Sequence, residues 1–161
     1  MYRWWAAAAI VSGLAWGAVL ATPGASAASG AGVSVKVTPN HGLVGGQTVT
    51  ITGRGLARSA AGKPLTWFAA QCTAAVHGHL EASTDTPHCD ISTAVGIKVG
   101  HNGSFTAHLR VISGIVGDGY CGTPGHTTCV IGVGTAQGAG TVSTISFKTA
   151  AAPASATTTS G

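Results

Sequence analysis

Residues 33–56 read VSVKVTPNHGLVGGQTVTITGRGL, and this stretch decides the fold class. Apolar and polar side chains alternate at 33–38 and again at 48–52, with the period of two that marks a half-buried β-strand. The PNHG run at 39–42 supplies turn residues between them. The stretch therefore predicts two β-strands separated by a turn.

The downstream sequence continues as short apolar or β-branched segments between glycine-rich turns. Five more strands are expected, at 65–72, 94–99, 105–111, 129–133 and 142–148. No segment shows the 3.6-residue period of an amphipathic helix. We therefore predict an all-β domain, a seven-stranded immunoglobulin-like antiparallel β-sandwich with two disulfides.

Residues 1–27 have the features of a secretory signal peptide. Arg3 gives a positive start, 6–20 are apolar and uncharged, and 25–27 offer small residues for cleavage. A membrane anchor is the alternative, but a spanning helix needs about 20 apolar residues. We expect a cleaved signal and a secreted monomer, free or associated with the cell envelope.

The folded domain is expected at 28–149. Residues 150–161 contain only Ala, Pro, Ser, Thr and Gly, so this tail lacks apolar anchors and is expected to be disordered. The whole chain carries a formal net charge of +4, and the basic side chains are scattered. No run of them neutralises adjacent phosphates, so charge gives no support for direct DNA binding.

Four cysteines follow the signal segment. An even number in an exported domain predicts two disulfides, which leaves three possible pairings. Sequential pairing closes the shortest loops. Closing a loop as long as the one between the first two cysteines stabilises the folded state by about 3 kcal/mol. A zinc site is the alternative, because three histidines lie between the first two cysteines, without a positioned fourth ligand. These residues are Cys72, Cys89, Cys121 and Cys129, with His77, His79 and His88.

Catalytic motifs are missing from the sequence. Glu81, Asp85 and Asp90 fall in one loop, which is not the spacing of carboxylates held on rigid strands for acid–base chemistry. No nucleophile elbow, phosphate-binding loop or metalloprotease helix occurs. We predict a protein that is not an enzyme and has no resident metal.

Small residues gather on one face of two predicted strands. If Trp67, Ala69, Ile131 and Val133 point into the core, the opposite face carries Phe68, Ala70, Gly132 and Gly134. Strand glycines often mark the close approach of a ligand or of another backbone. The face is therefore either the floor of a concave apolar site, bordered by both disulfides, or a place where glycines permit twist and bulges.

These residues resemble the neocarzinostatin family, whose secreted apoproteins carry an enediyne chromophore. The quoted 33–56 stretch carries the resemblance together with AAQC at 69–72, GHNGSFTAHLRV at 100–111, CVIGV at 129–133 and ISF at 145–147. The resemblance implies the pairing Cys72–Cys89 and Cys121–Cys129. It also implies a cleft that binds a hydrophobic chromophore non-covalently.

Several family ligand contacts are altered in this chain. The family's Trp two residues after the first cysteine is Ala74 here, and its Phe five residues past the second cysteine is Ala94. Polar groups after the last cysteine become Val130 and Gly134. Each lost ring removes stacking of about 0.5–1.5 kcal/mol. The small-residue floor is therefore retained, and the two aromatic rings that contact the ligand in the family are not.

The leading hypothesis is thus a non-catalytic secreted carrier of a small hydrophobic molecule. The resemblance makes an enediyne-type antibiotic the expected ligand, with any contact to DNA made through that ligand. The alternative is a cell-surface immunoglobulin-like module that binds a protein or glycan. A DNA-binding or antibacterial protein is a third hypothesis, from family association only.

Overall fold

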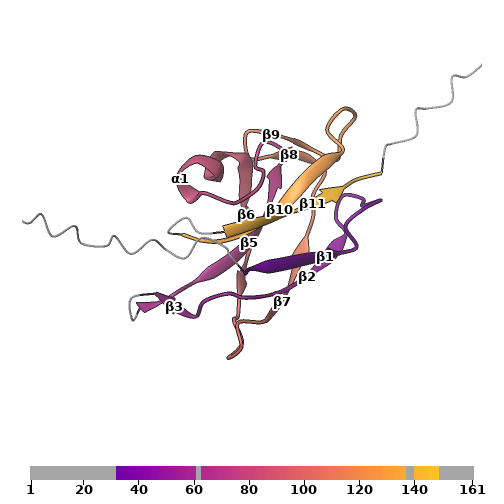
Figure 1. Cartoon of the computed structure of the whole chain (residues 1–161). Helices are drawn as coiled ribbons and strands as arrows, with labels where there is room; N and C mark the ends of the chain where they lie inside the picture. Colours follow the sequence, from indigo (N-terminus) through magenta and orange to yellow (C-terminus); the bar gives the residue numbers. More distant parts are fainter. Residues whose placement is uncertain (1–31, 61–62, 137–139, 149–161) are drawn as a thin grey trace, which may run out of the picture.

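Two antiparallel sheets face each other in the computed structural model, which describes residues 32–60, 63–136 and 140–148 (Figure 1). The first sheet has the order β1-β2-β7, with β1 at Ser34–Thr38, β2 at Thr48–Arg54 and β7 at Phe105–Arg110. The second has the order β11-β10-β5-β6, with β11 at Gly140–Ser146, β10 at Thr128–Thr135, β5 at Trp67–Thr73 and β6 at Cys89–Ile97. The expected signal segment and tail lie outside the described residues.

Short elements complete the chain. They are the paired β3 (Ser59–Ala60) and β4 (Lys63–Pro64), the paired β8 (Gly114–Val116) and β9 (Gly119–Cys121), helix α1 (Ala82–Asp85) and the 3₁₀ turn η1 (Thr86–His88). No helix in the described parts of the chain has the length and apolar character to cross a bilayer.

The seven predicted strands are confirmed as the strands of the sandwich. Each lies close to its expected position except β6, which begins at Cys89 although only residues 94–99 were expected to be extended. The residues between Cys89 and Ala94 lack an alternating pattern because they form an irregularity opposite β5. The predicted absence of long helices also holds for the described residues, where only α1 and η1 occur.

The main core lies between the two sheets. Trp67, Ala69, Ile131 and Val133 are all buried there, as the alternation predicted. The second sheet therefore turns one face inward and the opposite face outward, since neighbouring side chains along a strand point to opposite sides. A second buried cluster lies on the outer face, made of Ala70, Cys72, Val76, Cys89 and Val130.

The two disulfides lie on different sides of the second sheet. Cys72–Cys89 links directly opposed residues of β5 and β6 in the outer cluster, with an S–S distance of 2.02 Å. Cys121–Cys129 joins β9 to β10 within the main core. The expectation that both disulfides border the outer face is therefore wrong for the second, because Cys129 shares the core-facing side of β10 with Ile131.

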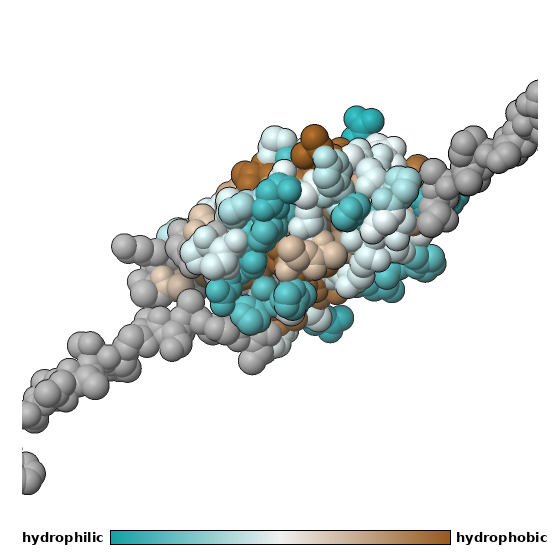
Figure 2. Space-filling view, turned by 90° about the horizontal axis from the view of Figure 1, so that it is seen from above, coloured by the Kyte–Doolittle hydropathy of each residue, from teal (hydrophilic) through white to brown (hydrophobic). Residues whose placement is uncertain are grey.

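Most of the face shown in Figure 2 has intermediate hydropathy, with hydrophilic patches spread over it. Hydrophobic side chains form small separate areas there, divided by hydrophilic ones.

Candidate ligand pocket

A pocket of about 430 Å³ lies against the outer face of the second sheet. We call it the outer pocket. Its lining comes from β5, β6, β10 and the segment between Cys72 and Cys89. The lining residues are Phe68, Ala70, Leu80, Thr86, Cys89, Ile91, Ala94, Gly132, Gly134, Thr135 and Ala136.

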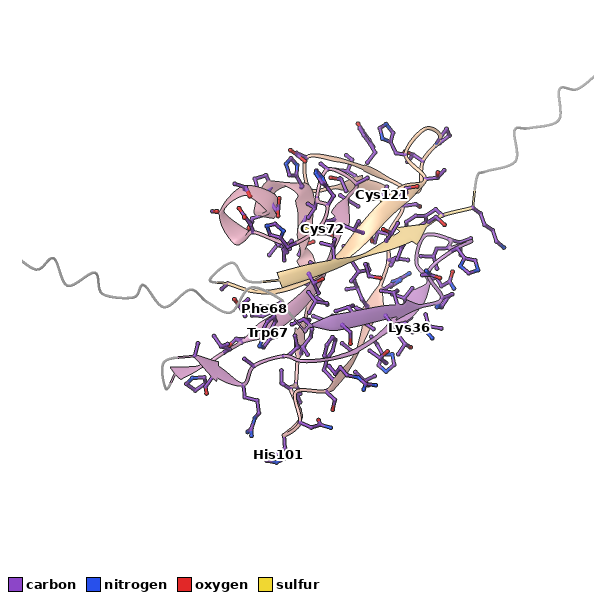
Figure 3. All side chains as sticks on the ribbon, in the orientation of Figure 1. Lys36, Trp67, Phe68, Cys72, His101 and Cys121 are labelled. Atoms are coloured by element: carbon purple, nitrogen blue, oxygen red, sulfur yellow. A yellow bond between two sulfur atoms is a disulfide. The ribbon has the colours of Figure 1, made fainter. Side chains whose placement is uncertain are left out.

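The floor of the outer pocket is formed by small residues on two neighbouring strands. Gly132 of β10 pairs with Ala70 of β5, and Gly134 pairs with Phe68. Phe68 is 39% exposed although it is a large apolar side chain, and Figure 3 shows it near one end of β5, with Cys72 toward the other. The floor is flat and almost free of side chains, with one aromatic ring at its edge.

Five of the seven positions named from the sequence line this pocket: Phe68, Ala70, Ala94, Gly132 and Gly134. The structure does not bring the other two into it. Ala74 is exposed outside the pocket because the chain turns away from the sheet after β5. Val130 faces the same side as Gly132 but lies in the buried cluster with Val76.

One wall of the pocket comes from an irregular part of β6. Ala69 pairs with Val95, whereas Gln71 pairs with Asp90, so four residues of β6 lie opposite Ala70 alone. Such a bulge re-aims side chains that a regular strand would place elsewhere. It brings Ile91 and Ala94 to the pocket.

Asp90 holds this bulge in shape. Its carboxylate accepts hydrogen bonds from the Ser92 hydroxyl at 2.6 Å, the Ser92 N–H at 3.0 Å and the Thr93 hydroxyl at 2.8 Å. Burial alone would raise the pKa of Asp90, but these hydrogen bonds outweigh it and lower the pKa below its usual value. The charged form of Asp90 therefore stabilises the wall.

The hairpin of β8 and β9 contacts the segment that leads into this wall. At its tip, the N–H of Asp118 donates to the carbonyl of Pro87 at 2.9 Å, and Asp118 Oδ1 lies 2.7 Å from Nδ1 of His88. Gly117 has φ +55 and touches the Pro87 carbonyl so closely that a β-carbon would collide with it. The hairpin tip thus braces the segment that leads into Cys89.

The base of this hairpin is attached through a buried amide. Gln71 is fully buried on the core-facing side of β5. Its side chain exchanges two hydrogen bonds with the backbone of Ile112, just before β8. The polar side chain is therefore satisfied, and it ties the hairpin to the sheet.

The histidines of the Cys72–Cys89 segment have separate partners. Nδ1 of His77 lies 2.7 Å from the Ala75 carbonyl, and Nε2 of His79 lies 3.2 Å from the Glu81 carboxylate, whereas His88 contacts the hairpin tip. Within the described residues, no three potential metal ligands come together.

The chemistry of the lining is apolar and uncharged. Thr86 and Thr135 contribute the polar side chains among the described lining residues, and the lining contains no Asp, Glu, His, Lys or Arg. An apolar site of this kind can bury a neutral apolar molecule. Leu80, Ile91, Thr86, Thr135 and Ala136 were not expected from the sequence, because their positions depend on the path of a loop, a bulge and a strand end.

The comparison with known proteins agrees with this architecture. No protein-family model matches the sequence, and no curated protein does. Among solved structures, macromomycin matches with a TM-score of 0.52 and 27% identity, over 72% of this chain and 99% of its own. Apokedarcidin, a solution structure, matches with a TM-score of 0.47 and 26% identity, over 73% of this chain and 100% of its own. Macromomycin is an apoprotein of the neocarzinostatin family, and through it this chain resembles that family in fold as well as in its sequence motifs.

Proposed function

We propose that this protein is a secreted, non-catalytic carrier that binds a neutral hydrophobic small molecule in the outer pocket. The observation that carries the proposal is the uncharged apolar pocket over a floor of Ala70, Gly132 and Gly134. Ligand pockets are typically concave and mostly apolar, with few polar groups that orient the ligand. The likeness to apoproteins of the neocarzinostatin family supports a carrier rather than an enzyme.

The resemblance makes an enediyne-type chromophore the proposed ligand. Any effect on DNA would then be an effect of the ligand, because the protein's basic side chains are scattered. Two disulfides and the signal-like first 27 residues support secretion. If the carrier proposal holds, protein purified from its native source carries an extractable apolar compound that absorbs beyond the tryptophan band and has a defined mass.

A floor variant tests the pocket with a known probe. Ala70→Leu places a larger side chain on the floor, and Ala74→Leu makes the same change at an exposed position outside the pocket. Prodan, a neutral dye with a naphthalene core, should bind the wild type and Ala74→Leu alike, and bind Ala70→Leu at least about tenfold more weakly. Equal binding by all three folded proteins would refute the proposed site.

A second candidate function is an interaction module that binds a protein or glycan. It is favoured by Ile115 and Tyr120, which pair across β8 and β9 and are 69% and 52% exposed. Exposed apolar side chains of this kind occur at binding surfaces. Replacing both by serine should abolish capture of a cell-envelope partner under this alternative, and should leave prodan binding unchanged under the carrier proposal.

A further inference from the structure

Leu80 lies directly over one of the floor glycines. A β-carbon added at Gly132 would lie 3.1 Å from Cδ1 of Leu80 and 3.4 Å from Sγ of Cys72. A β-carbon at this position would therefore be in tight contact with Leu80 and in ordinary van der Waals contact with Cys72. Glycine at 132 permits the close approach of a leucine from a distant segment.

Leu80 also contacts the neighbouring strand. Its N–H donates to the carbonyl of Gly140 at 3.4 Å, and its Cβ lies 2.9 Å from where a β-carbon of Gly140 would be. The segment that carries Leu80 is fastened at both ends by the Cys72–Cys89 disulfide, which joins residues 17 positions apart. Leu80 therefore rests on β10 and β11 from the outside as part of a closed loop.

This placement divides the outer face of the sheet into two regions. Val76 and Leu80 pack with Val130 and Cys72 in the outer cluster, and this region of the face does not line the pocket, although Cys89 does. Phe68 and Gly134 line the region that stays open. Along this face of β10, Gly134 and Gly132 line the pocket and Val130 does not; Leu80 lines the pocket, lies over Gly132 and packs with Val130, so it stands between the open floor and Val130 as an end wall.

We infer that Leu80 is the residue that sets ligand size in the outer pocket. This inference rests on the proposed carrier function. Leu80 stops a flat apolar ring system from extending along the floor toward Val130, so the pocket selects neutral ligands with a short fused-ring core over longer ones. The lining has no charged side chain, and the selection is therefore by shape and not by charge.

Two neutral dyes of different length test this inference. Prodan has two fused rings and Nile red has four. Leu80→Ala removes the end wall, so Nile red should bind this variant at least about tenfold more tightly than the wild type, the gain expected from burying about two further methylene equivalents. Prodan binding should change by less than about threefold, because prodan does not reach the wall. Leu65→Ala removes a partly buried leucine outside the pocket and should change neither affinity.

A stability measurement keeps the test independent of any ligand. Gly132→Ala should be less favourable for the melting temperature in the wild type, where the new methyl group meets Leu80, than in the Leu80→Ala background. Leu80→Val should shift Nile red affinity in the same direction by a smaller factor, and this variant serves if Leu80→Ala does not fold.

The outcomes separate the two claims. Suppose that the wild type binds prodan, but that Leu80→Ala raises the affinity for both dyes equally or for neither dye. The role of Leu80 is then refuted and the carrier proposal stands. If neither dye binds any folded variant, the carrier proposal fails. If neither dye binds but the effect of Gly132→Ala on the melting temperature still depends on Leu80, then Leu80 is a packing residue only. The size-selection role is overturned as well in that case.

Discussion

Replacing Gln71 by methionine removes two partly buried hydrogen bonds while nearly preserving side-chain length. Gln71 is 0% exposed on the core face of β5. The N–H of Ile112 donates to Gln71 Oε1 at 2.8 Å, and Gln71 Nε2 donates to the Ile112 carbonyl at 2.9 Å. Methionine can make neither bond, so both backbone groups of Ile112 lose their partner.

The expected loss in the free energy of unfolding comes from the unpaired N–H and carbonyl groups of Ile112. A typical hydrogen bond contributes about 0.5–1.5 kcal/mol net, and a buried group left unpaired costs about 1–3 kcal/mol. Ile112 is only half-buried, so solvent can replace part of what is lost. We therefore expect Gln71→Met to lower the free energy of unfolding by about 2–3 kcal/mol.

Urea unfolding followed by Trp67 fluorescence measures this change, because Trp67 is buried in the core. Gln47→Met is the matched control: Gln47 is half-buried, and its Oε1 accepts one exposed hydrogen bond, from the N–H of Val44 at 3.2 Å. The control should lose less than about 1 kcal/mol. If Gln71→Met loses no more than the control, Gln71 does not tie the hairpin to the sheet and the reasoning is refuted.

Three further predictions concern the wall of the outer pocket. Replacing Cys72 and Cys89 together by alanine should lower the free energy of unfolding by about 3 kcal/mol in urea titrations, and a change below about 1 kcal/mol would contradict the role of this disulfide. Asp90→Asn should reduce stability at neutral pH, because the charged carboxylate holds the bulge. The pKa of Asp90 is lowered in the folded state, so its contribution to stability is present above the unfolded value of about 3.8 and is lost as the pH falls through the folded pKa. The melting temperatures of the two proteins should therefore converge between pH 7 and pH 2. A difference in melting temperature that does not depend on pH would be contrary evidence. Gly117→Ala should destabilise by at least about 1 kcal/mol, since φ is +55 and the methyl group meets the carbonyl of Pro87, and unchanged thermal unfolding would show that the hairpin tip does not brace the wall.

The sandwich could be predicted from the sequence because its signals are local. Val49 and Ile51 alternate with threonines, and both are fully buried in the structure. The same alternation assigned Ala70, Gly132 and Gly134 to the face opposite Trp67. Side-chain direction along a strand depends only on position, so the floor needed no knowledge of the rest of the fold.

The walls could not be predicted in this way. Leu80 reaches the floor only because the Cys72–Cys89 segment folds back over the sheet, and nothing in its own sequence encodes that path. The bulge after Asp90 depends on hydrogen bonds to Ser92 and Thr93, which look like ordinary loop residues. These positions are set by tertiary contacts, which override local pattern.

One sequence expectation failed for a simpler reason. The sequence analysis places Cys129 beside the outer floor because this cysteine begins a strand that carries floor glycines. Its side chain instead points into the main core with Ile131, two positions later. The alternation of side chains along a strand predicts this inward direction of Cys129, since residues i and i+2 share a face.

Amide chemical-shift mapping with prodan tests the central claim most directly. If the outer pocket binds neutral apolar molecules, the signals of Phe68, Gly132, Gly134 and Ile91 should shift with saturation at a one-to-one ratio. Those of Lys36 and His101, which Figure 3 places away from Phe68, should stay in position. Shifts confined to Ile115 and Tyr120, or no shifts at all in the folded protein, would contradict the account.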